Sequence, residues 1–269
     1  MGDDRPIGIF DSGVGGLTVA HAIWELLPNE SVVYVGDGAR FPYGPKPVEE
    51  IRGYAMEIAA YLIDRGVKLL VVACNSVEVS AIGDIAAAAD IPVVGVIAPG
   101  VRAALRASRN GKIGVIGTEA TIRTGSYQRA VGSAAALHAA ACPVFVEHVE
   151  RGDTTSSELR AAAAGYLAPL KGMDVDTVIL GCTHYPLLSG LLQLELGPDV
   201  VLVSSAEETA KDVYAELLRG DALRQAASAP HHAFLTTGDA TAFRELAELF
   251  LGREVTHVDA VHVDARGLA

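Results

Sequence analysis

The sequence has few cysteines, few basic residues and no long hydrophobic run, and each shortage argues against a class of protein. Its three cysteines lack the even, dense spacing of a secreted disulfide framework, which favours reduced thiols and a cytoplasmic location. The 21 lysines and arginines are outnumbered by 33 aspartates and glutamates, and the net charge of −12 argues against binding to nucleic acid or to anionic membranes. No apolar run approaches the roughly 20 residues of a membrane span, and the acidic start does not resemble a signal peptide.

Signatures of metal and nucleotide sites are also missing. No C-x-x-C pair or H-x-x-x-H spacing is present that would supply zinc ligands. The glycine-rich residues 11–16 (DSGVGG) have neither the P-loop spacing nor a clean G-x-G-x-x-G. Glycines before a helix allow the backbone to approach a ligand, but the Asp11 carboxylate disfavours a phosphate. A ligand that carries an ammonium group as well as a carboxylate suits this loop better.

What the chain does contain is a regular alternation of apolar strands and amphipathic helices. Half of its 269 residues are hydrophobic, and the mean hydropathy is +0.31, so a large core is expected. Apolar, β-branched runs separated by helical patterns predict mostly parallel sheets. The predicted strands lie near residues 7–10, 31–35, 69–73, 92–96, 113–117, 142–146, 177–181, 200–203 and 233–236. The predicted helices lie near 17–27, 47–65, 76–89, 120–131, 156–170, 187–195, 206–219 and 240–251, and residues 205–208 predict a capping box.

Two pairs of landmarks indicate an internal duplication. The strand-and-turn pattern that begins at Ile7 returns at Ile113, 106 positions later, and Cys182 follows Cys74 by 108 positions. The sequence therefore predicts an α/β fold of two pseudo-equivalent domains with an active site in the cleft between them. We expect residues 1–97 with 208–269 to form the first domain and residues 98–207 to form the second.

Cys74 and Cys182 each follow a predicted strand and precede small polar residues. In parallel sheets the carboxyl ends of the strands are where ligands bind, so both thiols are candidates for chemistry. A thiol needs only modest help to become partly ionised near neutral pH, and two thiols across a substrate carbon can remove and return a proton. A nucleophilic pair of Cys182 with His184 is a rival interpretation. Cys142 lies in an apolar stretch and is interpreted as a packing residue.

For the other polar candidates the residues alone leave structural and functional roles equally open. Asp11 has the position of a helix cap, Glu150 could form an exposed ion pair, and His184 could be a core histidine bonded to a backbone carbonyl. Successive residues on a strand point to opposite faces, whereas Cys182 and His184 are two positions apart and can share one face.

Four motifs together resemble the glutamate racemases of the cofactor-independent aspartate/glutamate racemase superfamily. They occur in the order and spacing of that family, and the resemblance extends from residue 7 to about residue 250. It implies two α/β domains, often in a homodimer, no cofactor and no metal, glutamate as substrate, and supply of D-glutamate for peptidoglycan. The motifs are residues 10–19 (FDSGVGGLTV), 42–44 (PYG), 73–76 (ACNS) and 181–186 (GCTHYP).

The resemblance also implies roles for individual residues. Cys74 and Cys182 match the two catalytic acid–base thiols, and Asp11, His184 and Glu150 match the residues that assist them. The positions that match the substrate-binding residues are Asp11, Ser12, Tyr43, Gly44, Asn75, Ser76, Thr183 and His184, with Thr118 and Thr121 as further contacts.

The chain departs from the family pattern at two places behind Cys74. Ser76 stands where many members have threonine, which keeps the hydroxyl and loses a methyl group. Val77 and Glu78 replace small residues, so the helix after Cys74 is expected to be packed or charged unusually. Two other functions stay open at this point, namely racemisation of aspartate or a related small acid, and a non-catalytic module that closes on an acidic ligand.

Overall fold

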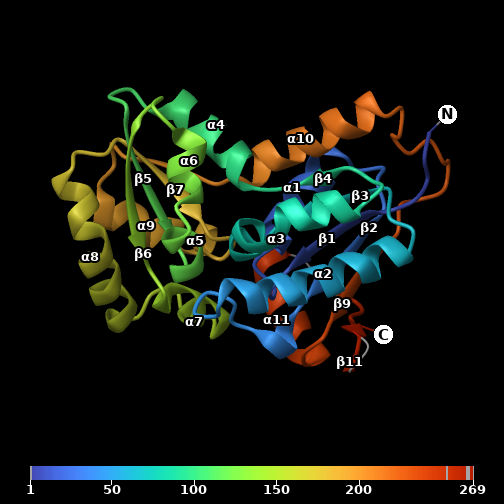
Figure 1. Ribbon diagram of the computed structural model, residues 1–269. Helices are drawn as coiled ribbons and strands as arrows, with labels where there is room; N and C mark the ends of the chain where they lie inside the picture. Colours follow the sequence, from blue (N-terminus) through green and yellow to red (C-terminus); the bar gives the residue numbers. More distant parts are fainter. Residues whose placement is uncertain (1, 253, 265–266, 269) are drawn as a thin grey trace.

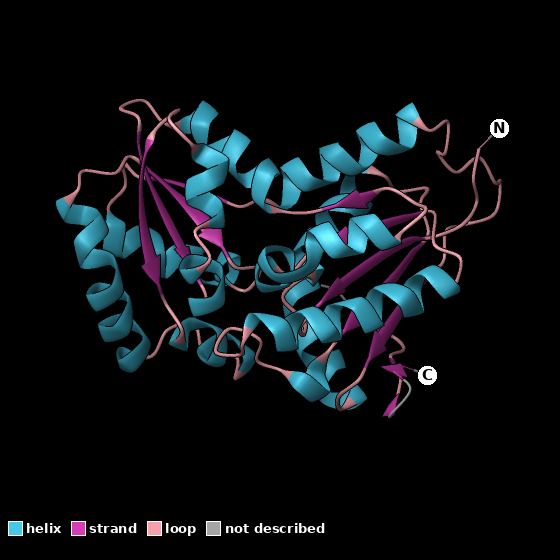
Figure 2. Ribbon diagram, viewed as in Figure 1, coloured by secondary structure: helices cyan, strands magenta, loops and turns pink. Residues whose placement is uncertain are grey.

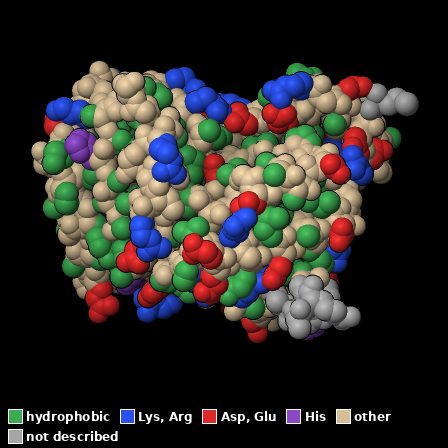
Figure 3. Space-filling view, in the orientation of Figure 1, with side chains coloured by type: hydrophobic (Ala, Val, Ile, Leu, Met, Phe, Trp, Pro, Cys, Tyr) green, Lys and Arg blue, Asp and Glu red, His purple; other side chains and the backbone are tan. Residues whose placement is uncertain are grey.

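The computed structural model describes residues 2–252, 254–264 and 267–268, which form two parallel sheets covered by helices (Figures 1 and 2). The sheets lie at opposite ends of the molecule with α3 (Asn75–Ala88) between them (Figure 1). Within this part of the chain no helix is long and apolar enough to cross a membrane. On the face drawn in Figure 3, acidic and basic side chains are interspersed.

The first sheet has six parallel strands in the order β10-β9-β2-β1-β3-β4. The late strand β9 pairs with β2, so the chain returns to complete this sheet, as the sequence predicted. Its strands are β1 (Ile7–Asp11), β2 (Val32–Gly36), β3 (Leu69–Val72), β4 (Val93–Val94), β9 (His232–Thr236) and β10 (Asp259–Ala260).

The second sheet has four parallel strands in the order β6-β5-β7-β8. This order repeats β2-β1-β3-β4 of the first sheet, which confirms the internal duplication. The strands are β5 (Lys112–Gly117), β6 (Ala136–Ala141), β7 (Thr177–Gly181) and β8 (Val201–Val203). A short antiparallel pair, β11 (Val263–Asp264) and β12 (Gly267–Leu268), lies near the end of the chain.

Helices cover both faces of each sheet, so the central strands β1, β3 and β7 are buried on both sides. One face of the first sheet packs on α1 (Leu17–Leu26), α10 (Ala206–Arg219) and α11 (Ala240–Leu251), and the other packs on α2 (Val48–Asp64) and α3. The second sheet packs on α7 (Val144–Glu150), α8 (Ser157–Gly172) and α9 (Ser189–Leu196) on one face, and on α4 (Ile97–Ala107) and α6 (Ser126–Val131) on the other.

Three predictions about local structure were wrong. The predicted strand 142–146 is instead the start of α7, because Pro143 occupies a helix N-cap and Phe145 and Val149 reach the core at helical spacing. The strand lies earlier, over the alanine-rich β6, where pairing with β5 overrides the weak β-propensity of alanine. The predicted helix 120–131 is divided into α5 (Glu119–Arg123) and α6, because Gly125 adopts a left-handed conformation with φ +67°.

The third error is the capping box predicted at residues 205–208. Ser205 is the N-cap of α10 but has a helical backbone, so its hydroxyl makes no capping hydrogen bond. Glu208 is drawn instead to Arg106 and Lys211, at 2.6 Å from each. A sequence pattern identifies the helix start here, but the side-chain contacts depend on the neighbouring helix.

The strand order places two crevices face to face. Strand β2 lies on one side of β1 and strand β3 on the other, so the direction in which strands are added reverses at β1. Such a reversal opens a crevice at the carboxyl ends of β1 and β3. The same reversal occurs at β5 and β7. Register pairs Phe10 with Val72 and Gly117 with Gly181, so the residues after these strands are neighbours. The polar residues that follow β1, β3, β5 and β7 therefore meet at one place.

Candidate active site

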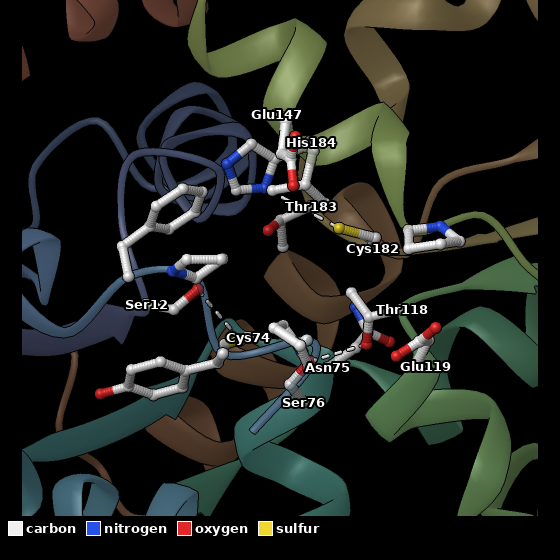
Figure 4. A pocket seen from close by; sticks show the side chains of 17 residues that line it. Ser12, Cys74, Asn75, Ser76, Thr118, Glu119, Glu147, Cys182, Thr183 and His184 are labelled. Carbon is white, nitrogen blue, oxygen red and sulfur yellow. Dashed lines mark hydrogen bonds between the residues drawn. The ribbon is translucent and has the colours of Figure 1, made fainter. Parts of the chain in front are cut away.

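A cavity of about 210 Å³ lies where the carboxyl ends of the two sheets meet. Cys182 and His184 are on one side of it, Cys74, Asn75 and Ser76 are on the opposite side, and Thr118 enters from the second sheet (Figure 4). Both candidate thiols thus face the same space from different sheets. The predicted site residues that line the cavity are Ser12, Tyr43, Gly44, Cys74, Asn75, Ser76, Thr118, Cys182, Thr183 and His184.

Cys74 is the N-cap of α3, directly after β3, and its side chain is almost fully buried. Its sulfur lies 3.6 Å from the Ser12 hydroxyl. Burial and the nearby Asp11 carboxylate both disfavour a second negative charge, so the pKa of the Cys74 thiol is raised well above its ordinary value. Cys74 is therefore held in its protonated form, ready to donate.

Cys182 belongs to a chain of three contacting groups. Its sulfur lies 3.8 Å from His184 Nδ1, and His184 Nε2 lies 2.6 Å from the Glu150 carboxylate. Burial by itself lowers the pKa of His184, but the hydrogen bonds to Cys182 and Glu150 outweigh burial and raise this pKa to about 10. The imidazolium places a positive charge beside the Cys182 sulfur.

The contact between Cys182 and His184 was predicted from strand alternation, but a turn creates it. Strand β7 ends at Gly181, and His184 has a helical backbone as the N-cap of η2 (Tyr185–Leu188). Glu150, the last residue of α7, reaches His184 from behind and does not line the cavity. Of the two roles left open for Glu150, its pairing with His184 at 18% side-chain exposure favours a supporting role over an exposed surface ion pair.

Asp11 is fully buried and lies behind the cavity wall. Its Oδ2 accepts hydrogen bonds from the Gly16 backbone N–H at 2.5 Å and from the Thr183 hydroxyl at 3.3 Å, and Ser12 donates to Oδ1 at 3.4 Å. Gly16 is the N-cap of α1, so Asp11 fills the structural role that the sequence allowed and also bridges the two halves of the site.

Hydroxyl and amide groups from both sheets line the side of the cavity that carries Cys74. The Ser76 and Thr118 hydroxyls are 2.8 Å apart, and Thr118 in turn contacts Thr121 at 3.0 Å. Thr121 does not line the cavity and supports Thr118 from behind. The Tyr127 hydroxyl donates to Asn75 Oδ1 at 2.7 Å, which leaves the buried Asn75 Nδ2 without a hydrogen-bond partner among the described residues. This amide is a donor available to a ligand.

The segment 41–45 lies over the first-sheet side of the cavity. It follows the short helix η1 (Gly38–Arg40), and the Phe41–Pro42 peptide bond is cis. The Tyr43 hydroxyl donates to Asp37, and the Ala120 N–H donates to the Gly44 carbonyl at 3.1 Å. Burial raises the pKa of Tyr43 far above its usual value, so Tyr43 stays neutral.

One glycine is required for the two halves to approach. A side chain at Gly15 would place its Cβ only 2.5 Å from the Thr183 hydroxyl and would collide with the His184 ring. The glycine-rich loop therefore packs directly against the segment that carries Cys182. This contact accounts for the glycine at position 15 of the loop without any bound phosphate.

Sequence reasoning missed several residues that line the cavity. Phe41, Pro42 and Pro45 lie in or beside the motif at residues 42–44, and that proximity is the signal that could have identified them. Glu119 and Glu147 carried no such signal, because isolated glutamates in helices are usually solvent-exposed. No lysine or arginine lines the cavity within the described residues. The missed residues are Phe41, Pro42, Pro45, Glu119, Pro143, Val146 and Glu147.

The fold and the cavity define a class of protein in which two α/β units each present one thiol to a shared small-molecule site. A model of the Asp/Glu/hydantoin racemase family matches residues 16–213, and the chain belongs to this family. Its sequence is similar to glutamate racemase from Corynebacterium diphtheriae, with 53% identity over 259 residues that cover 96% of this chain and 98% of the relative.

Solved structures give the same relationship. Glutamate racemase isoform RacE1 from Bacillus anthracis superposes with a TM-score of 0.89 and 42% identity, covering 97% of this chain and 98% of its own. Glutamate racemase from Francisella tularensis, crystallised in complex with D-glutamate, superposes with a TM-score of 0.92 and 34% identity over 98% of this chain and 99% of its own. Both share the mixed α/β fold with two mostly parallel sheets.

Proposed function

We propose that this protein interconverts L- and D-glutamate, with Cys74 and Cys182 as its two acid–base groups. The observation that carries the proposal is the placement of the two thiols on opposite sides of one cavity (Figure 4). The full-length similarity to proteins named glutamate racemase supports glutamate as the substrate. A non-catalytic binding module would need the polar residues but not a second thiol.

The lining supports binding of an amino acid with two carboxylates. The Asn75 amide and the Ser12, Ser76, Thr118 and Thr183 hydroxyls can donate to carboxylate oxygens without any lysine or arginine. The start of α3 adds positive potential on the same side. The Asp11 carboxylate behind the wall favours the substrate ammonium group near Ser12 and Thr183.

The proposed reaction moves one proton in each direction. The thiolate of one cysteine removes the α-proton and becomes a thiol, and the thiol of the other cysteine protonates the opposite face of the carbanion and becomes a thiolate. The opposite enantiomer reverses the two roles. The His184 imidazolium stabilises the Cys182 thiolate, and Glu150 keeps this imidazolium charged and oriented. This mechanism uses no pyridoxal phosphate, metal or nucleotide.

Other features extend the proposal beyond the reaction. We infer a cytoplasmic homodimer that supplies D-glutamate for peptidoglycan, because these properties follow from the family resemblance. We also propose that the domain boundaries lie at residues 97/98 and 207/208, where α4 and α10 begin to cross between the sheets.

A chiral assay of the purified protein with both enantiomers of glutamate and of aspartate tests the substrate. Turnover of glutamate is expected to exceed turnover of aspartate about a hundredfold, because the shorter substrate places its α-carbon on the order of 1 Å from the best position. Comparable kcat/KM for both acids would assign a different substrate, and absence of any racemisation would favour the binding module.

Cysteine variants and deuterium labelling test the mechanism. Cys74→Ala and Cys182→Ala should each lose roughly 10²- to 10⁴-fold in turnover, whereas Cys142→Ala should retain most activity because Cys142 packs in the second-sheet core. In D₂O at low conversion, the product enantiomer should carry deuterium at Cα and the recovered substrate should remain largely protium. Proton NMR of the separated enantiomers measures both, and a product that keeps its original α-proton contradicts the two-thiol mechanism.

A further inference from the structure

Val77 and Glu78, which replace the small residues of the family pattern, differ in where their side chains lie. Val77 is fully buried in the first-sheet core. Glu78 does not line the active-site cavity and points away from it, toward the segment that joins β4 to α4. Its backbone N–H donates to the Cys74 carbonyl at 2.9 Å in the first turn of α3, so Glu78 is bonded directly to the residue that carries one thiol.

The Glu78 carboxylate holds the start of α4. Its Oε2 accepts the Val96 N–H at 2.5 Å and the Ile97 N–H at 2.9 Å. Val96 is the N-cap of α4 and supplies no side-chain cap itself. A Cβ at Gly95 would lie 2.5 Å from the Glu78 carboxyl carbon, so the absence of a side chain there makes room for the carboxylate. A side chain from one helix therefore caps the next helix.

Helix α4 transmits this contact to the second sheet. Ile97, Val101 and Ala104 of α4 pack in one cluster with Ile179 of β7. Strand β7 ends at Gly181, immediately before Cys182. A short route of direct contacts thus runs from Cys74 through Glu78 and α4 to the strand that carries the other thiol, and α3 lies between the two sheets along this route (Figure 1).

We propose that Glu78 is a positioning residue that fixes α4 to α3 and thereby sets how Cys182 faces Cys74 across the substrate. This inference rests on the proposed function, since position matters only if both thiols act on one carbon. An ionised carboxylate makes hydrogen bonds roughly twice as strong as a neutral acceptor does. The proposal therefore predicts that the ionised form of Glu78 is the form that holds the two halves in register.

The surroundings of Glu78 make ionisation costly. Burial raises its pKa to about 7, and the two backbone hydrogen bonds offset this only in part. In the described part of the chain no lysine or arginine forms an ion pair with it. Asp84 and Arg129 line the same surface groove, but Asp84 pairs with Arg52 and the Arg129 guanidinium bonds to Thr124 and Ser126. Tyr127 interacts electrostatically with Glu78 while its hydroxyl donates to Asn75, and the arginines of α4 pair with α10.

The test compares Glu78→Ala and Glu78→Gln with the wild type. The alanine variant loses the contact and is expected to show a kcat about 10- to 100-fold lower with KM changed less than about threefold, because misplaced thiols affect proton transfer more than binding. The glutamine variant keeps a hydrogen-bond acceptor but cannot titrate, so its kcat should stay within several-fold of the wild-type value. The wild-type kcat should decline as the pH falls through about 7, and the glutamine variant should lack this decline. Asp84→Asn removes a carboxylate from the same helix without touching α4 and should leave kcat unchanged.

Stability measurements separate positioning from simple helix capping. A raised carboxyl pKa means that ionisation costs stability above the folded pKa, and no cost remains below the unfolded value of about 4.5. The thermal midpoint of Glu78→Gln should therefore exceed that of the wild type at pH 8, and the difference should shrink at pH 5 and vanish below about pH 4.5. A Glu78→Ala variant that is less stable but has wild-type kcat and pH profile overturns the proposal, as does a Glu78→Gln profile identical to the wild type. Wild-type protein that does not racemise glutamate contradicts the proposed function instead.

Discussion

At the scale of single residues, the site depends on buried acids that contact groups far away in the sequence. Asp11 accepts a hydrogen bond from Thr183, and Glu150 bonds to His184. Each acid fixes the charge or orientation of a neighbour that lines the cavity. The pKa of His184 is the most informative consequence, because His184 stays protonated at a pH where an exposed histidine is neutral.

We expect the stability of the protein to fall between about pH 6.5 and pH 10 because of His184. A histidine whose folded pKa is raised contributes stability that is complete below the unfolded pKa and disappears as pH rises through the folded value. Glu150→Gln removes the anionic partner of His184. Over this pH range the thermal midpoint of the variant should therefore fall less than that of the wild type, with a difference of roughly 5 °C. Thermal denaturation at pH 6, 8 and 10 measures the difference. The exposed Glu245→Gln variant should retain the full wild-type slope, and an equal slope in Glu150→Gln would contradict the assignment.

At the scale of elements, helix starts position the site. Helix α3 begins beside Cys74 and α5 begins at Thr118, whose hydroxyl accepts the Thr121 N–H at 3.2 Å. Helix starts elsewhere differ in how they are capped, although they look alike in the sequence. Ser156 has an extended backbone and its hydroxyl accepts the Leu159 N–H at 3.2 Å, whereas Ser205 has a helical backbone and makes no such bond.

This contrast predicts different costs for two similar substitutions. Ser156→Ala should lower the free energy of unfolding by about 1 kcal/mol, because it removes a capping hydrogen bond from α8. Ser205→Ala serves as the matched control and should change this free energy by less than about 0.5 kcal/mol. Urea denaturation of both variants measures the difference. Equal losses in the two variants would show that the backbone conformation at Ser205 does not decide its contribution.

At the scale of the whole molecule, one buried ion pair joins segments from four parts of the chain. Lys68 Nζ lies 2.6 Å from Glu30 Oε2, and both side chains are almost fully buried. Lys68 also donates to the Asp3 and Ala222 carbonyls, at 2.7 and 2.8 Å, and Glu30 accepts the Arg224 N–H at 2.8 Å. The amino-terminal segment, the residues just before β2 and β3, and the connection from α10 to β9 therefore meet at this pair.

Breaking this pair should be costly. Lys68→Met leaves Glu30 buried without its cation and is expected to lower the free energy of unfolding by about 3–5 kcal/mol. The double variant with Glu30→Leu should recover much of that loss, because no uncompensated charge remains. Arg219→Ala, which breaks an exposed pair with Glu216, should cost less than about 1 kcal/mol. Urea denaturation tests all three, and a Lys68→Met loss as small as that of Arg219→Ala would rule out a structural role for the pair.

The sequence by itself determined the strands that form the two sheets, except β6 and β10, and the segments that meet at the cavity. Buried parallel strands are continuous apolar runs, so β1, β3, β5 and β7 could be located from local pattern alone. The repeated offsets predicted the duplication that appears in the strand order of the two sheets, and polar residues that follow those strands, such as Ser12 and Thr183, line the cavity. The strand at 142–146 failed because alanine-rich β6 is stabilised by pairing with β5, which no local pattern records.

Only the tertiary structure decided which side chains reach the cavity and which act from behind it. Asp11, Glu150 and Thr121 belong to the predicted set but lie behind the lining, while Glu119 and Glu147 line it without any motif. Glu78 likewise turns from the cavity to α4. The physical reason is that a side chain's direction is set by packing between elements that are distant in the sequence. Periodicity fixes the face of a strand or helix, but the partner across that face exists only after the two sheets have come together.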